Sequence, residues 1–490
     1  MPLTLYSNMY AVPPYNNMTQ FDWVTSAACP IGLSHCSARV VPAQSYDFHS
    51  YIMDRGLEFG MTNFEIDFIN FQQCVDQGAA RSQPRSSIHL QPSHLSASRS
   101  LSFTDTSTDV RAFDEWWGGM SQAAAEHGTP VQLCMDLPAV ALASVQWGAI
   151  TNARLQGDGF PDDGGRYDIF QSSLLYSAID LAPFLDVVWT TSCQPLPDNV
   201  FKECEPHVEQ LNFIAALSAG PVGFGDAIGM TNMTLLNMSC RSDGVLLQPS
   251  APATPVEFTF LGGFSVAAGG GARIAAAPSF VPRERAAAPP AAPVFPWPAA
   301  AVAAGPWYSV IGVFVGGAAP TPVRPSDLAP LLEPAGDVVG FLSYAPLSMS
   351  LARIAAACAD GADAFAGGCA ARFSEAAPLQ VSAVDVDVFS IAPVFAAADG
   401  AGEGWCLLGE LAKTTRVSPT RFLSAAPCAE GGAGTLCFAV AGAAGEAVFV
   451  TLVAPGGVVR VLTLSFGASG GVANATCTGS GAAAECAATM

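Results

Sequence analysis

Lysine is almost absent from this chain. The sequence contains two lysines, Lys202 and Lys413, and its formal net charge is −21. Proteins that bind nucleic acid need a basic surface to neutralise phosphates, so this acidic balance argues against a nucleic-acid partner. A neutral, hydroxyl-rich partner such as a sugar is compatible with it. Half of the residues are apolar (50%), which excludes global disorder and predicts a large buried core.

Several motifs that carry chemistry are also missing. The six histidines show neither HExxH nor HxH spacing, and the cysteines form no zinc-like CxxC pair, so we expect no metal. The paired glycines lack the lysine of a phosphate-binding loop, and no G-x-S-x-G elbow occurs. We therefore expect no cofactor.

Long apolar runs and a leader-like N-terminus are missing as well. No stretch of about eighteen apolar residues is free of proline or charge, so no membrane-spanning helix is predicted. The start, MPLTLYSNMYAVPPY, has no basic residue ahead of an apolar run, which predicts no secretory signal. Four N-x-[ST] sequons favour a glycoprotein of a secretory or lysosome-like compartment, and they lie at Asn17, Asn232, Asn237 and Asn474.

Cysteine is the residue type present in unusual number, at fourteen. Two pairs, Cys29 with Cys36 and Cys193 with Cys204, are close enough in sequence to form disulfides. The sequence is equally compatible with a buried free thiol, instead of a disulfide, at each of these cysteines.

Residues 1–250 alternate between strand-like and helix-like patterns. The strand-like runs are 3–10, 62–68, 130–137, 148–155, 184–191 and 220–227. The helix-compatible segments are 46–59, 110–127, 139–145, 169–182 and 207–219. This alternation predicts parallel strands joined by right-handed crossovers, as in an α/β fold of the (β/α)8-barrel type.

A closed barrel of this type needs eight strands, and the sequence predicts six. Either the start of the barrel is missing, or strands inside residues 20–45 escape the pattern. Residues 78–109 are polar and without periodicity, which predicts a disordered insertion.

The composition changes near Pro249, and residues 255–490 contain many short β-prone runs separated by Gly and Pro. This pattern predicts an antiparallel β-sandwich as a second domain. The proline-rich tract 278–306 is expected to be irregular.

Acidic residues follow several of the predicted strands. Side chains alternate along a strand, so Glu65 and Asp67 share one face of FEIDF. Three more predicted strands are followed by Asp136, Asp158 and Asp226. Carboxyl ends of parallel strands form the rim of a barrel, where these carboxylates could meet a sugar. Helix caps, ion pairs or a solvated loop would give the same pattern.

The succession FEIDF, VQLCMDLP, ARLQGDGF and LSAGPVGFGDAIGMTNMTLL resembles the barrel core of the α-galactosidase and raffinose-synthase group of glycoside hydrolases. The resemblance implies that Asp67 is the nucleophile and Asp158 the acid/base. It also implies that Arg154 precedes the acid/base and that Asp226 belongs to the last strand loop. Gln156 and Gly157 stand where that group has Ser and Asp.

This resemblance implies a retaining glycosidase acting on an α-galactoside-like oligosaccharide or other glycoside. The carboxyl groups of Asp67 and Asp158 should then lie roughly 5 to 6 Å apart. Glu65, Asp136, Arg154 and Asp226 would bind the sugar, and Trp189 would stack on its ring. Two alternatives stay open: a raffinose-synthase-like glycosyl transferase, and a non-catalytic carbohydrate-binding relative.

Overall fold

A computed structural model gives the fold of the chain. It describes residues 3–7, 10–11, 18, 20–25, 37–66, 109–134, 138–155, 163–194, 204–258, 273–284, 303–313, 321–328, 338–344, 356–381, 388–396, 403–428 and 434–489. The chain divides into two compact units. The first comprises Met1–Gly157 and Ala178–Phe184, and the second Asp158–Ser177 and Leu185–Met490.

A curled, half-barrel-like parallel sheet is the centre of the first unit. Its five strands are β1 (Leu3–Ser7), β5 (Met61–Ile66), β6 (Val131–Leu133), β7 (Ile150–Arg154) and β8 (Ala182–Val188). They pair in chain order, and every pair is parallel. The order never reverses, and in a sheet of this order right-handed crossovers are expected to place the connecting helices on one face.

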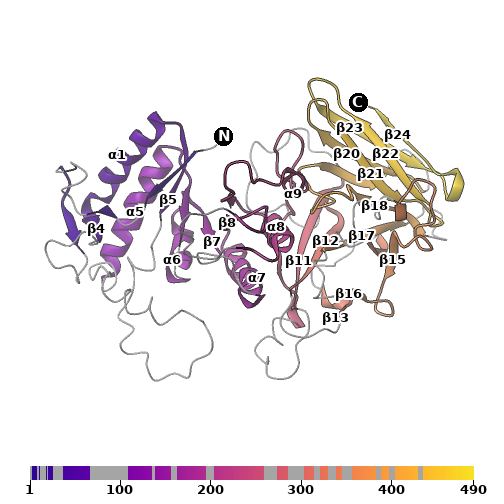
Figure 1. Cartoon of the computed structure of the whole chain (residues 1–490), viewed down its shortest axis with the longest axis horizontal. Helices are drawn as coiled ribbons and strands as arrows, with labels where there is room; N and C mark the ends of the chain where they lie inside the picture. The colour runs from indigo at the N-terminus through magenta and orange to yellow at the C-terminus, as the bar shows by residue number, and fades with distance from the viewer. Residues whose placement is uncertain are drawn as a thin grey trace. The chain divides into compact units, whose positions relative to one another are not determined.

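The helices of this unit are α1 (Ser45–Glu58), α5 (Val110–Glu126) and α6 (Pro138–Ala143). Two 3-10 turns adjoin them, at Pro42–Gln44 and Ser144–Gln146. The side chain of Asp109 caps α5 by accepting a hydrogen bond from the amide of Arg111 (2.9 Å). Helices α1 and α5 lie side by side, and α1 also contacts β5 (Figure 1).

All the strands and helices predicted for residues 1–250 are present, with shifted ends. The expected strands correspond to β1, β5, β6, β7, β8 and, in the second unit, β9 (Val222–Phe224), which pairs in parallel with the last residues of β8. The helix predicted to start at residue 169 begins earlier, at Asp163. Residues 78–108 of the predicted insertion lie outside the described residues.

Residues 20–45 do contain strands, but these are not barrel strands. There β4 (Ser37–Val40) pairs with both β3 (Trp23–Thr25) and β2 (Tyr10–Ala11) in a separate antiparallel sheet. The idea that this region supplies the missing parallel strands is therefore wrong for its described residues.

The second unit contains α7 (Asp163–Ala178) up to Ser177, α8 (Val208–Leu217) and α9 (Met233–Asn237). Its other strands form antiparallel sheets (Figure 1). One sheet has the order β10-β11-β12-β17-β18-β21-β22, with β14 pairing β15 and β17. The order of a second sheet is β19-β20-β23-β24, and β13 pairs with β16.

The strands of the large sheet have the following bounds: β10 (Thr254–Pro255), β11 (Arg273–Pro282), β12 (Ala303–Val313), β14 (Val338–Tyr344), β15 (Ala370–Phe373), β17 (Val388–Ala396), β18 (Glu403–Gly409), β21 (Ala447–Val453) and β22 (Val459–Ser465). Those of the smaller sheets are β13 (Thr321–Val323), β16 (Leu379–Val381), β19 (Phe422–Pro427), β20 (Leu436–Gly442), β23 (Gly471–Thr478) and β24 (Glu485–Thr489). Residues of both larger sheets, such as Leu407 and Phe438, belong to one hydrophobic core cluster.

The prediction of an irregular tract over 278–306 is wrong at both ends. Strand β11 continues to Pro282 and β12 begins at Ala303, and the two pair along this stretch. Pro278 donates no backbone hydrogen bond to the ladder, and its carbonyl accepts one from the amide of Ser250 outside the β11–β12 ladder (2.8 Å). In the described part of the chain, no helix combines the length and apolarity that a membrane span requires.

Candidate functional site

One face of the parallel sheet in the first unit carries a row of polar side chains. Glu65 on β5 is in register with Gln132 on β6, and Gln132 is in register with Asn152 on β7. Residues in register on parallel strands project to the same side, so these three share a face. Arg154, two residues beyond Asn152, projects to that side as well. We call these four residues the buried polar face.

Helix α1 packs on the opposite side of the sheet, against β5. Phe64 neighbours Glu65 on β5 and therefore projects the other way. Its ring contacts His49 of α1, with the ring centroids 6.1 Å apart. Among the described residues, the side of β5 that carries Phe64 therefore packs against α1, and the buried polar face lies on the other side of the sheet.

Every member of the buried polar face is shielded from solvent. The exposed fractions are 8% for Glu65, 3% for Gln132, 5% for Asn152 and 5% for Arg154. Burial of a carboxylate, a guanidinium and two amides is unfavourable by several kcal/mol unless hydrogen bonds or a function offset it. Polar groups of this kind inside an otherwise apolar sheet mark it as the candidate site.

Hydrogen bonds connect this face to its neighbours. The guanidinium of Arg154 donates to the sulfur of Cys134 (3.3 Å), the residue directly after β6. The amide of Asn63 donates to the side-chain oxygen of Gln132 (3.4 Å). Hydrogen-bond donors and acceptors therefore lie on three neighbouring strands. The hydroxyls of a polyol can form hydrogen bonds with groups of both kinds.

The structure places two of the predicted site residues, Glu65 and Arg154, on this face. Asp67, Asp136 and Asp158 lie outside the described residues. In the sequence, Asp67 follows Ile66, the last residue of β5. Trp189 and Asp226 belong to the second unit. The predicted separation of Asp67 and Asp158 thus stays a prediction.

Asp226 holds together the loops that follow β8 and β9. Its carboxylate accepts hydrogen bonds from the amide and the hydroxyl of Thr190 (2.8 and 2.6 Å) and from the side chain of Gln194 (3.0 Å). Gln194 in turn accepts from the amide of Ala227 (2.8 Å), and the Thr190 hydroxyl accepts from the amide of Asn232 (2.7 Å). Asp226 therefore has a positioning role in these loops.

Trp189, the residue after β8, is 4% exposed. Its carbonyl accepts a hydrogen bond from the side chain of Asn212 on α8 (2.7 Å). Trp116, Trp117 and Trp147 form a cluster of rings in the first unit, with centroids 5.0 Å apart for Trp116 and Trp117 and 5.9 Å apart for Trp117 and Trp147. These tryptophans are core residues.

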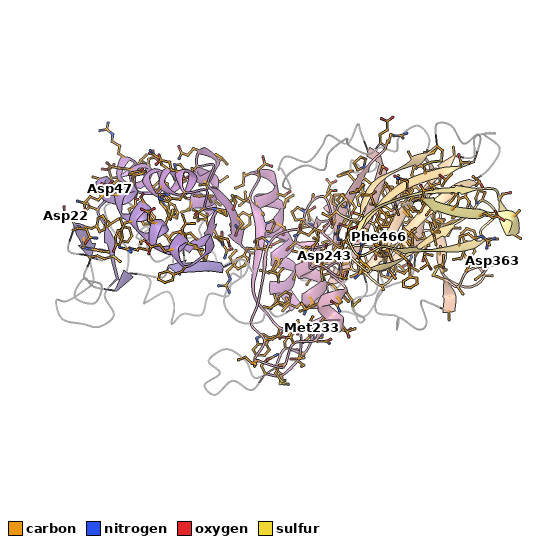
Figure 2. The ribbon with its side chains drawn as sticks, turned by 90° about the horizontal axis from the view of Figure 1, so that it is seen from above. Asp22, Asp47, Met233, Asp243, Asp363 and Phe466 are labelled. Atoms are coloured by element: carbon orange, nitrogen blue, oxygen red, sulfur yellow. A yellow bond between two sulfur atoms is a disulfide. The ribbon has the colours of Figure 1, made fainter. Side chains whose placement is uncertain are left out.

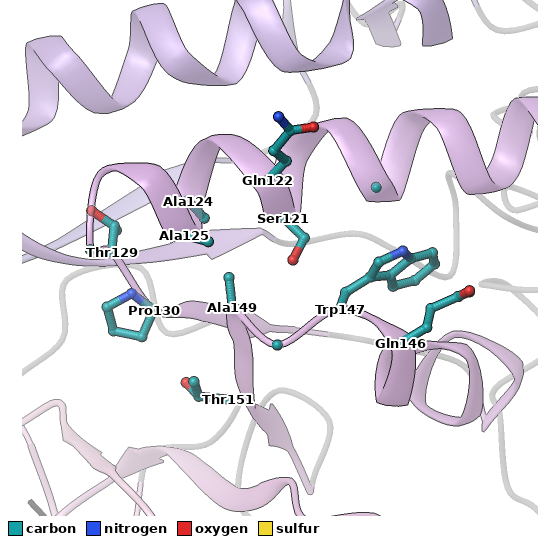
Figure 3. Close-up of a pocket in the computed structure, with 13 residues that line it drawn as sticks. Ser121, Gln122, Ala124, Ala125, Thr129, Pro130, Gln146, Trp147, Ala149 and Thr151 are labelled. Atoms are coloured by element: carbon teal, nitrogen blue, oxygen red, sulfur yellow. The ribbon is translucent and has the colours of Figure 1, made fainter.

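A pocket of about 490 Å³ lies elsewhere in the first unit, along α5 (Figure 3). Pro130 and Ala149, which line it, immediately precede β6 and β7, so the pocket adjoins the amino ends of these strands. None of the predicted site residues lines it. Ligands of parallel sheets bind at the carboxyl ends, so we do not assign the active site to this pocket.

Two members of the candidate site, Gln132 and Asn152, were not singled out by the sequence. The available signal was a single polar residue, Gln132, inside the apolar run VQLCM, whereas ITNAR holds three polar residues and does not set Asn152 apart. Only the register shows that Gln132 lies next to Glu65 and that Asn152 lies next to Gln132. Among the described residues, no group of three or more His, Cys, Asp or Glu could hold a metal ion.

No family model matches this chain, and no curated protein matches it.

Proposed function

We propose that the chain is a retaining glycosidase that acts on an α-galactoside-like oligosaccharide. The observation that carries the proposal is the buried polar face, which lies on one side of a parallel sheet whose strands pair in chain order. Interior polar groups of such a sheet suit the many hydroxyls of a sugar. Glycosyl transfer to a second sugar would use the same groups, with a hydroxyl in place of water.

Asp67 has the role of nucleophile in this proposal. It lies two residues after Glu65 in the sequence, directly beyond the end of β5. Its carboxylate attacks the anomeric carbon, the bond to the leaving oxygen breaks, and a covalent glycosyl-enzyme forms. Asp158, four residues after the end of β7, protonates the leaving oxygen and then removes a proton from the attacking water.

Glu65, Gln132, Asn152 and Arg154 bind the sugar hydroxyls in this proposal. Their carboxylate and amide oxygens accept hydrogen bonds from hydroxyls, and their amide and guanidinium groups donate to them. Asp136, three residues after the end of β6 in the sequence, would bind a hydroxyl as well. The proposal includes an eight-stranded barrel around this sugar and a β-sandwich built from the antiparallel sheets.

Turnover of aryl α-galactosides by the full chain tests the proposal. Asp67→Asn should abolish turnover of every substrate, because no covalent intermediate can form. Asp158→Asn should spare aryl substrates with good leaving groups and should be partly rescued by azide, which attacks the intermediate without a base. Equal losses in both variants on all substrates, with no azide effect, would remove these roles.

A matched control is Asp180→Asn. Asp180 is exposed and has a positive φ of 59°, a conformation that asparagine also adopts readily. This variant changes charge in the same way and should retain full turnover. Saturable galactoside binding without product release by the native chain would favour the non-catalytic, carbohydrate-binding alternative.

A further inference from the structure

The four-stranded sheet of the second unit exposes a glycosylation sequon. Strand β23 alternates strictly from Ala473 to Thr478: Ala473, Ala475 and Cys477 are buried, and Asn474, Thr476 and Thr478 are exposed. The first and third residues of the sequon Asn474-Ala475-Thr476 therefore project together from the solvent side of the sheet.

Disulfides close both hairpins of the same sheet. Cys428 bonds to Cys437 across β19 and β20, and Cys477 bonds to Cys486, its register partner on β24. The second unit also contains the predicted Cys193–Cys204 bond and a Cys358–Cys369 bond. Disulfides of this number persist in secreted and lumenal proteins and are rare in reducing compartments.

The surroundings of Asn474 leave space for a glycan. Its register partners are Ala439 on β20 and Thr489 on β24, both short side chains. Asn232 differs, because its side-chain oxygen caps α9 by accepting from two backbone amides (3.1 and 3.2 Å). Asn237 ends that same short helix, and Asn17 lies outside the described residues.

We propose that Asn474 carries an N-linked glycan acquired in an oxidising, lumenal compartment. The side-chain nitrogen of Asn474 bonds to C1 of an oligosaccharide carried on a lipid pyrophosphate. The bond between C1 and the pyrophosphate oxygen breaks, the lipid pyrophosphate leaves, and the amide loses one proton. The glycan then covers the exposed side of the sheet. This inference does not depend on the glycosidase proposal.

The test is expression of the full chain behind a cleavable secretion signal in eukaryotic cells. The secreted protein is treated with peptide N-glycosidase in ¹⁸O water, which converts each glycosylated asparagine into a labelled aspartate. We expect the label at Asn474 by peptide mass spectrometry. Asn474→Gln and Thr476→Ala should each lose it, whereas Thr476→Ser preserves the sequon and should retain it.

Two results would overturn the proposal. The first is folded, disulfide-bonded protein in which Asn474 is unlabelled, including protein labelled only at Asn17, Asn232 or Asn237. The second is label at Asn474 that survives Thr476→Ala, because the modification would then not depend on the sequon. Circular dichroism of Thr476→Ala and Thr476→Ser verifies that both variants fold, so loss of label reports the modification itself.

Discussion

Two buried arginines of the second unit have contrasting surroundings. Arg421 donates hydrogen bonds to Glu410 (2.7 Å) and to both carboxylate oxygens of Glu446 (2.7 and 2.8 Å). The guanidinium of Arg416 lies over the ring of Tyr344, 5.0 Å from its centre. None of its three nitrogens has a hydrogen-bond partner in the described structure, and burial lowers the pKa of Arg416 to about 10.

These surroundings predict opposite results for the same substitution. Arg421→Met leaves two buried carboxylates without their partner and should lower the free energy of unfolding by about 3–5 kcal/mol. Arg416→Met removes a buried charge that forms no ion pair with any described carboxylate, so the free energy of unfolding should stay within about 1 kcal/mol of native or increase. Urea unfolding measures both. Equal losses would show that Arg416 has a counter-charge that this account lacks.

His49 makes the first unit sensitive to acid. Burial lowers the pKa of this histidine from 6.5 to about 4, although a hydrogen bond to the carbonyl of Ser45 acts the other way. Between these pH values the unfolded chain binds a proton that the folded chain does not, so stability falls as pH falls. The loss at pH 4 should be roughly 3 kcal/mol at 1.36 kcal/mol per pKa unit.

The check is urea unfolding at pH 7 and at pH 4, with tryptophan fluorescence as the signal that reports unfolding. His49→Phe cannot take up the proton. From pH 7 to pH 4 its free energy of unfolding should therefore fall by roughly 3 kcal/mol less than that of the native chain. Identical acid losses in both proteins would mean that His49 titrates normally in the fold.

At the scale of elements, the loops after β8 and β9 depend on Asp226. Asp226→Ala leaves the amide of Thr190 and the side chain of Gln194 without their acceptor, which should lower stability by about 1–3 kcal/mol. Faster proteolysis within residues 190–194 or 225–232 should accompany the loss. Unchanged stability and proteolysis, with weaker galactoside binding, would give Asp226 a substrate-binding role instead.

The end of β20 requires glycine at position 442. A Cβ atom there would clash with the ring of Phe466, a core residue labelled in Figure 2. Gly442→Ala should therefore destabilise the protein by about 1–3 kcal/mol. Gly467→Ala is the matched control, since nothing lies within 4 Å of its added Cβ. Thermal unfolding distinguishes them, and equal melting temperatures would contradict the packing described here.

Strongly periodic elements could be predicted from the sequence, whereas strands rich in small residues could not. The valine- and phenylalanine-rich runs of β17, β21 and β22 have the composition of strands. Strands β11 (RIAAAPSFVP) and β23 (GVANATCT) consist largely of residues with weak strand preference. These two segments form strands because they pair with β12 and β20. The partners are distant in the sequence, so the local residue pattern does not predict the pairing.

For the candidate site, the sequence predicted the polar residues at strand ends but not their neighbours across the sheet. Glu65 was identified because it shares a strand face with Asp67, and Arg154 because the family resemblance places it before the acid/base. Gln132 and Asn152 share the face of Glu65 and Arg154 because of the register between the strands. The pairing of β6 with β7 contains a register shift between Val131 and Gln132. Such an irregularity changes which side chains share a face, and no period-two pattern predicts it.

At the scale of the whole molecule, the account rests on one claim, that Asp67 forms a covalent bond to the sugar. A 2-fluorogalactosyl substrate with a good leaving group slows the hydrolysis of that bond, so the intermediate should accumulate. Peptide mass spectrometry of the trapped full chain should find one 2-fluorogalactosyl adduct on Asp67, and Asp67→Asn should remain unlabelled. An adduct on another residue, or none while turnover of aryl galactosides continues, would contradict the account.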